Sequence, residues 1–126
     1  RIKKCTCRTH SYRFCERDKT MKTYKLSECG DRGWFIGDFA KAAYQTKDFE
    51  VTYQKNVRSQ TASHIHKLAY EITLVISGRQ ICNGQMFAAG DICILEPGDI
   101  SQIEYLEETE VVTIKTPSIP SDKHLL

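Results

Sequence analysis

The sequence contains no apolar run that approaches the roughly 20 residues a helix needs to cross a bilayer. It also begins without the continuous apolar stretch of a signal peptide, because basic residues interrupt the first positions. Disorder over the whole chain is excluded too, since 40% of the residues are hydrophobic and 27% are charged, an ordinary globular composition. We therefore expect a soluble, cytoplasmic protein with no membrane contact.

A strong net charge is also absent. The 126 residues carry a formal charge of +2, from 18 Lys and Arg against 16 Asp and Glu. Residues 1–20 hold seven basic and two acidic side chains, so the part from Met21 onward is mildly acidic, with a net charge of −3. An acidic body gives no basis for expecting a nucleic-acid partner. Residues 1–20 are predicted to be a basic extension outside the core, and residues 21–126 a single domain.

Cysteine is not scarce: the chain has six, an even number of the kind that builds disulfide frameworks in small secreted proteins. Cys82 and Cys93 nevertheless lie in apolar, strand-like runs, where a free cysteine behaves as a small hydrophobic residue. Reduced thiols are therefore expected, as in a reducing cytosol. Four N-terminal residues carry zinc-binding groups, but in a spacing that does not favour a zinc site: Cys5, Cys7, His10 and Cys15.

Short apolar or alternating segments recur along the chain, separated by Gly, Pro and Asn. The expected strands are residues 49–54, 63–66, 71–77, 80–82, 85–87, 92–95, 103–106 and 111–115. Asn83-Gly84, between two of them, is a favoured type I′ hairpin turn. Closely spaced strands of this kind predict an all-β fold, a small antiparallel sandwich or barrel. After Pro117 we expect a polar C-terminal arm that frays toward its end.

The segment His64-Ile65-His66, followed by Glu71, carries the clearest chemical signal. Side chains at i and i+2 leave the same face of an extended backbone, so the two imidazoles can act together. The chain bends through residues 67–70, which lets the Glu71 carboxylate return to that face. Two imidazoles and a carboxylate suit a divalent transition metal, and they can also act as an acid–base cluster without one. Catalytic and metal-ligand roles are therefore predicted for His64, His66 and Glu71.

The same residues resemble the first sequence motif of the cupin superfamily, G-x5-H-x-H-x3,4-E-x6-G. His64, His66, Glu71 and Gly78 match it, and Arg58 stands in place of its leading glycine. A second motif, G-x5-P-x-G-x2-H-x3-N, is matched with one register adjustment by Gly90, Pro97 and Gly98.

The second motif lacks its histidine, because Ser101 stands at that position, and its asparagine is missing as well. The resemblance implies a small antiparallel jelly-roll barrel. In metal-binding cupins two histidines and a glutamate of the first motif join the second-motif histidine. Here it implies three ligands, His64, His66 and Glu71, for iron, manganese, nickel or zinc, or a site without metal.

We predict from this resemblance a metal-dependent enzyme that acts on a small polar metabolite. Residues 33–39 and 115–123 resemble small cupins of carbohydrate-related gene neighbourhoods, so a carbohydrate is the expected substrate. Two alternatives stay open. One is a metal-free isomerase or epimerase of a nucleotide-linked keto-sugar, and the other is a cupin that binds a small molecule without catalysis.

Three residues outside the cluster are predicted to bind this small-molecule ligand. Arg58 precedes the histidine strand and can bind an anionic group, whereas Ser101 and Tyr105 follow the second-motif turn. The edges of sheets in such barrels commonly pair between protomers, so we also expect a homodimer.

Overall fold

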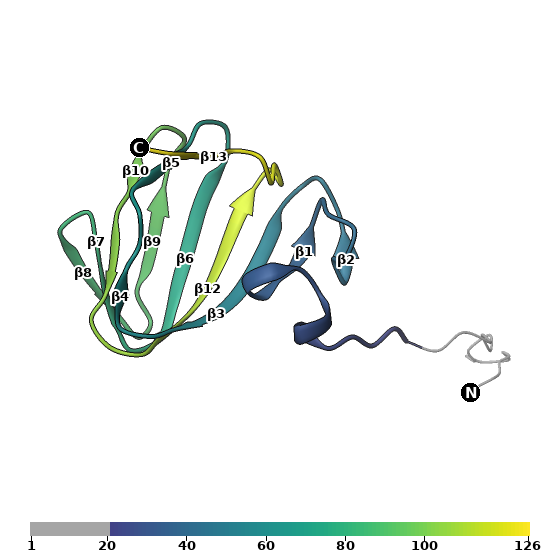
Figure 1. Cartoon of the computed structure of the whole chain (residues 1–126), viewed down its shortest axis with the longest axis horizontal. Coiled ribbons are helices and arrows are strands. Elements are labelled where there is room, and N and C mark those ends of the chain that lie inside the picture. Colours follow the sequence, from purple (N-terminus) through teal and green to yellow (C-terminus); the bar gives the residue numbers. More distant parts are fainter. Residues whose placement is uncertain (1–20) are drawn as a thin grey trace, which may run out of the picture.

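Thirteen strands and two single-turn 3₁₀ helices make up residues 21–126, the part of the chain that this computed structural model describes (Figure 1). The largest sheet has the order β2 (Tyr44–Gln45), β1 (Trp34–Gly37), β3 (Glu50–Asn56), β12 (Thr109–Thr116), β6 (Tyr70–Ser77) and β9 (Ile92–Leu95). A second sheet has the order β10 (Ile100–Ser101), β5 (His64–His66) and β13 (Lys123–Leu125). The third has the order β4 (Ser59–Gln60), β11 (Ile103–Tyr105), β7 (Arg79–Cys82) and β8 (Gln85–Ala88). The 3₁₀ helices are η1 (Leu26–Glu28) and η2 (Asp31–Gly33).

This architecture confirms the all-β prediction. No helix among residues 21–126 is long and apolar enough to cross a membrane. The basic extension predicted for residues 1–20, with its four zinc-binding groups, lies outside the described residues.

The six-stranded sheet turns the polar side of its central strands inward. Thr113 of β12 lies opposite Thr52 of β3 on one side and Thr73 of β6 on the other, and all three are buried. Their burial is tolerated because the hydroxyls find partners: Thr73 and Thr113 lie 3.0 Å apart, and Thr52 donates to the Arg32 carbonyl at 2.9 Å. The interior of the fold is therefore polar where β3, β12 and β6 meet.

The outer side of the same sheet is apolar near β9, the strand that ends it. Ile92 and Ile94 of β9 are more than half exposed, and Leu74 and Ile76 of β6 are 39% and 44% exposed. Within the described residues β9 pairs with β6 alone, so its other edge carries free backbone groups. This face and edge suit the expected homodimer, which stays a prediction.

The apolar core joins the third sheet to the six-stranded sheet. Cys82, Ile103 and Tyr105 are buried together, and Cys93 and Leu95 of β9 pack against them. Cys82 and Cys93 are free thiols, as expected from the sequence.

The hairpin predicted at Asn83-Gly84 is confirmed. Both residues have positive φ, 51° and 83°, as a type I′ turn requires, and they join β7 to β8. Gly78, the last residue of the first motif, also has a positive φ of 85°. A Cβ at Gly78 would collide with the Glu108 carbonyl oxygen, so only glycine lets β6 turn into β7 beside that segment.

The C-terminal arm differs from the expectation, because it is ordered as a strand. In β13, Lys123 pairs with His66 and Leu125 pairs with His64, so the arm covers one edge of the histidine strand (Figure 1). The physical reason is Asp122, whose buried carboxylate accepts the backbone N–H groups of three consecutive residues. These donors belong to Lys67, Leu68 and Ala69, at 3.1, 2.9 and 3.0 Å. A sequence pattern could not reveal a contact between residues so far apart.

Candidate functional site

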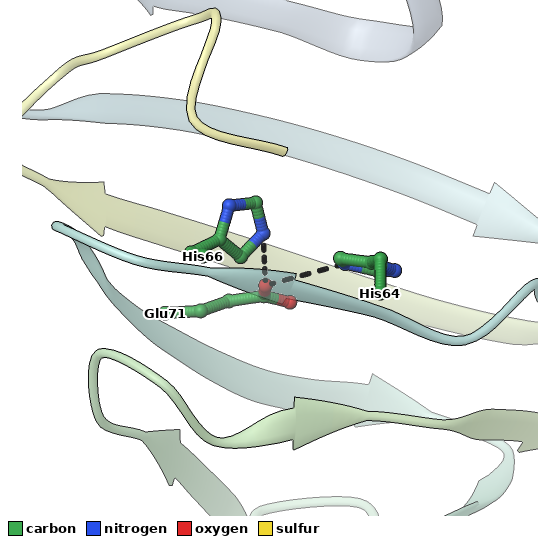
Figure 2. A group of neighbouring side chains, drawn as sticks. All are labelled: His64, His66 and Glu71. Atoms are coloured by element: carbon green, nitrogen blue, oxygen red, sulfur yellow. Dashed lines mark ion pairs between the residues drawn. The ribbon is translucent and has the colours of Figure 1, made fainter. Parts of the chain in front are cut away.

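The predicted cluster forms inside the fold, where the short strand β5 faces the beginning of strand β6. His64 and His66 leave the same side of β5, and both are buried. Glu71 enters from the inner face of β6 and is also buried. Its Oε1 lies 3.0 Å from Nε2 of His66 and 4.0 Å from Nε2 of His64. Figure 2 shows the carboxylate reaching toward both rings. One ligand atom of each residue lies within 4.8 Å of the others.

The backbone fixes which nitrogen of each ring faces the carboxylate. Nδ1 of His66 lies 3.1 Å from the Asp122 carbonyl oxygen, and Nδ1 of His64 lies 3.2 Å from the Ala62 carbonyl oxygen. A carbonyl only accepts hydrogen bonds, so it assigns the proton to Nδ1 in both rings. In the neutral form of each ring, Nε2 therefore carries the lone pair.

Two atoms of the cluster are buried acceptors without a hydrogen-bond partner among the described residues. Nε2 of His66 and Oε1 of Glu71 lie close to each other, yet neither makes a hydrogen bond within residues 21–126. Buried polar atoms are rarely left in this state, because each costs about 1–3 kcal/mol when it is unsatisfied. A shared proton, or a cation that both atoms bind, would satisfy the pair.

The spacing of the donor atoms fits a divalent metal ion. Two ligands that are each about 2.1 Å from one ion and about 90° apart are separated by about 3 Å, which is the His66–Glu71 distance of 3.0 Å. His64 lies farther back, since its Nε2 is 4.0 Å from Oε1 and the three ligand atoms span up to 4.8 Å, so a small movement of its ring toward the ion would complete the set. The residues present therefore fit such an ion, and their two His and one carboxylate leave further coordination positions open.

The electrostatics favour the protonation states that a metal needs. Burial lowers the pKa of His64, because desolvation disfavours its charged form more than the Ala62 carbonyl and Glu71 favour it. Burial opposes ionisation of Glu71, but the contact with His66 and the charge of Lys115 outweigh it, so its pKa lies below the ordinary value. At neutral pH the cluster therefore offers a neutral imidazole and a carboxylate.

The three predicted substrate-binding residues lie in different places. Ser101 of β10 pairs with His64, so its side chain shares the face of that histidine, and its buried Oγ has no hydrogen-bond partner among the described residues. Tyr105 is buried in the apolar core beside Cys82. Arg58 is exposed between β3 and β4 and lines neither of the cavities described next. The substrate-binding role of these residues stays a prediction.

The cluster opens into two adjoining cavities. The inner one, of about 100 Å³, is lined by the cluster and by side chains of β3 and β12. The outer one, of about 460 Å³, is a size that suits a small molecule. Both cavities share four lining residues, which the sequence analysis did not identify as site residues: Arg32, Trp34, Lys115 and Lys123. One of them could have been found from the sequence: Lys115 is two positions after Thr113 in strand β12, so the two side chains lie on the same face.

Comparison with solved structures identifies the architecture. A protein with a double-stranded β-helix domain from Klebsiella pneumoniae matches with a TM-score of 0.57 and 21% identity, over 81% of this chain and 89% of that one. A Ralstonia eutropha protein of unknown function with a cupin-like fold matches with a TM-score of 0.53 and 17% identity, over 74% and 60% of the two chains. The DMSP lyase DddQ from Ruegeria pomeroyi matches with a TM-score of 0.57 and 14% identity, over 74% and 50%.

Likeness at these identities establishes the fold alone. A comparison with protein-family models and a search of curated proteins find no match.

Proposed function

Because the chain has the cupin fold, a jelly-roll of antiparallel strands, and carries the buried cluster, we propose that it is a metal-dependent enzyme acting on a small polar metabolite. The observation that carries this proposal is the pair of buried acceptors, Nε2 of His66 and Oε1 of Glu71, which lie 3.0 Å apart and have no hydrogen-bond partner in the part of the chain that the structure describes. Structures with this fold include a lyase, so the fold is compatible with catalysis. A carbohydrate remains our proposed substrate class.

His64, His66 and Glu71 are the proposed ligands of iron, manganese, nickel or zinc. A divalent ion held there would supply Lewis-acid chemistry toward a substrate oxygen. The Asp122 carbonyl holds the His66 ring in orientation, as outer partners of metal-binding histidines do. Ser101, beside His64, adds a hydroxyl that can donate a hydrogen bond to a bound molecule.

Metal analysis of the full chain, purified without a histidine tag, tests the proposal. After dialysis against each of the four metals in turn, we expect about one equivalent of the preferred ion per chain. His66→Ala should retain less than about 0.2 equivalents of metal at this site, because the substitution removes a ligand whose orientation the Asp122 carbonyl fixes.

His124→Ala is the matched control, because His124 lies one strand away and, opposite Ile65 in the register, faces away from His64 and His66. It should leave the metal content unchanged. A wild-type protein that takes up no metal, or a His66→Ala protein that takes up as much as wild type, would contradict the proposal.

A metal-free isomerase or epimerase of a nucleotide-linked keto-sugar is the second candidate. It is favoured by the close His66–Glu71 contact, in which a carboxylate can raise the basicity of an imidazole. In that case His64 or His66 accepts a proton at Nε2, and His64→Ala or His66→Ala should abolish turnover while chelators leave the wild-type activity intact. Binding of a keto-sugar nucleotide without any product would instead indicate a binding protein, the third possibility left open by the sequence.

A further inference from the structure

Basic side chains gather around the outer cavity. Arg32, Lys41, Lys115 and Lys123 line it, against two carboxylates, Asp31 and Glu50. The surrounding chain, from Met21 onward, has a net charge of −3, so this excess is local and not a property of the whole surface. Three of the four basic residues also line the inner cavity that holds the cluster. The path to the cluster is therefore positively charged.

One of these charges is already balanced within the fold. Lys115 lies opposite Glu50 in the sheet register, and its Nζ is 3.6 Å from that carboxylate. The same Nζ lies 4.7 Å from the centre of the Trp34 ring, which gives it a second favourable contact. Lys115 is thus a fixed part of the cavity wall.

Arg32 and Lys123 are not balanced in this way, since neither forms an ion pair within residues 21–126. Lys123 lies opposite His66 in the register, so its side chain leaves the strand on the side of the cluster. Arg32 and Lys123 line the same two cavities, so their charged groups face a common space. Partial burial and the charges of Arg32 and Lys115 lower the pKa of Lys123, against the opposing charge of Glu71. Two cations that share a cavity and form no ion pair among residues 21–126 are available to bind an anion.

The backbone of Arg32 supports a role for its side chain. Arg32 has a φ of 52° and a ψ of 37°, a left-handed conformation that costs a residue other than glycine about 1–2 kcal/mol. Thr52 and Gln54 of β3 hold it there by donating hydrogen bonds to its carbonyl at 2.9 and 3.0 Å. Glycine would meet this geometry without strain, so an arginine here points to a use for the guanidinium.

We propose that the substrate of the proposed enzyme carries an oxyanion, a carboxylate or a phosphate, which Arg32 and Lys123 bind at the mouth of the cavity. The rest of the molecule then extends toward His64, His66 and Glu71. This proposal rests on the proposed function, and it narrows the substrate to acidic small molecules. The indole of Trp34 and the ring of Phe39 provide an apolar wall for the carbon skeleton.

Titrations of the ¹⁵N-labelled full chain, followed by two-dimensional NMR, test it with two matched pairs of sugars. D-Galacturonate is compared with D-galactose, and D-glucose 6-phosphate with D-glucose, so that each pair differs mainly in the anion. We expect at least one acid to bind about tenfold more tightly than its neutral partner, with shifts at Arg32, Trp34 and Lys123. The pair that responds distinguishes a carboxylate from a phosphate.

Three variants identify the residues responsible. Arg32→Gly and Lys123→Ala should each weaken binding of the acid by about tenfold, as expected for the loss of one charge-assisted contact. Arg32→Gly should also unfold at the same or a higher temperature than wild type, because it relieves the strained backbone, so weaker binding cannot be ascribed to misfolding. Lys47→Ala removes an exposed charge outside both cavities and should leave binding unchanged.

Three outcomes overturn the proposal: equal binding of acids and neutral sugars, shifts confined to other parts of the protein, or no shift at the mouth up to about 50 mM of any probe. The metal content of the same samples is measured separately. If the protein binds the anion but takes up no metal, this inference stands and the proposed function fails. If it takes up metal but does not bind the anion, the proposed function stands and this inference fails.

Discussion

Replacing Asp122 tests whether the C-terminal strand builds the site. In Asp122→Ala the three N–H groups that its carboxylate accepts lose their partner. The N–H of Ala69 is buried, and an unsatisfied buried donor costs about 1–3 kcal/mol. The other two belong to exposed residues, Lys67 and Leu68, where water can replace part of the bond, so we assign about 0.5–1 kcal/mol to each.

The total is a loss of about 3 kcal/mol from the free energy of unfolding, which for a domain of this size lowers the Tm by about 10–15 °C. Thermal unfolding followed by circular dichroism measures it. Asp91→Ala is the matched control, because Asp91 accepts one N–H, that of Ala88 at 2.8 Å, in an exposed turn. It should cost less than about 1 kcal/mol. An Asp122→Ala protein that unfolds within about 1 °C of wild type would refute the reasoning.

The same contact makes stability depend on pH. Burial opposes the charge of Asp122, but the hydrogen bonds from the N–H groups of residues 67–69 lower its pKa below the ordinary value. The folded state therefore binds its proton less readily than the unfolded state, and the contribution is complete above the ordinary Asp pKa of about 3.9. It is lost as the pH falls through the lowered value. The difference between wild type and Asp122→Asn should be constant near neutral pH and shrink below about pH 4, as urea unfolding at a series of pH values can show.

Three other predictions concern the fold and its surfaces. Gly78→Ala should destabilise the protein by about 2–4 kcal/mol in urea unfolding, through strain and the collision with Glu108, whereas Gly84→Ala, with a similar φ of 83° but open space around it, should cost about 1 kcal/mol. Burial raises the pKa of Cys82 to about 12, so its thiol should resist iodoacetamide at pH 8 in the folded protein and react after unfolding, as peptide mapping can show; labelling in the folded state would contradict this. Ile94→Lys, on the exposed face of β9, should convert the expected homodimer into a monomer in light scattering; a wild-type protein that is already monomeric would refute the homodimer.

The sequence was sufficient to predict the cluster because its parts are local. His64 and His66 are two positions apart on one strand, and Glu71 follows after a single bend, so the period of a strand and one turn bring all three together. The Asn83-Gly84 hairpin was predictable for the same reason, since two residues determine its turn type. In both cases the information lies within about ten residues of the chain.

The cavity around the cluster was not predictable in this way, because distant segments build it. Arg32 reaches the mouth only because η2 packs against β3, and Gly33 allows this approach, since a Cβ there would collide with the Tyr53 carbonyl oxygen. Lys123 arrives through the pairing of β13 with β5. The sequence instead favoured Arg58, an arginine that is near the histidines along the chain and exposed in the structure. Proximity in sequence is a poor guide where the neighbours come from opposite ends of the domain.

Strand β6 buries its more polar face, and this choice connects the cluster with the apolar outer surface. Its alternation places Glu71, Thr73 and Val75 on one side and Ile72, Leu74 and Ile76 on the other, and hydrophobicity alone would bury the second set. The structure buries the first set. A one-residue register slip would bury the isoleucines and expel Glu71 from the cluster. Polar contacts oppose that slip: the Thr73–Thr113 contact within the sheet, and the anchoring of residues 67–69 by Asp122 just before the strand begins. The apolar side of β6 is then left facing outward, so the interactions that assemble the proposed catalytic cavity also create the surface that a second copy is expected to cover.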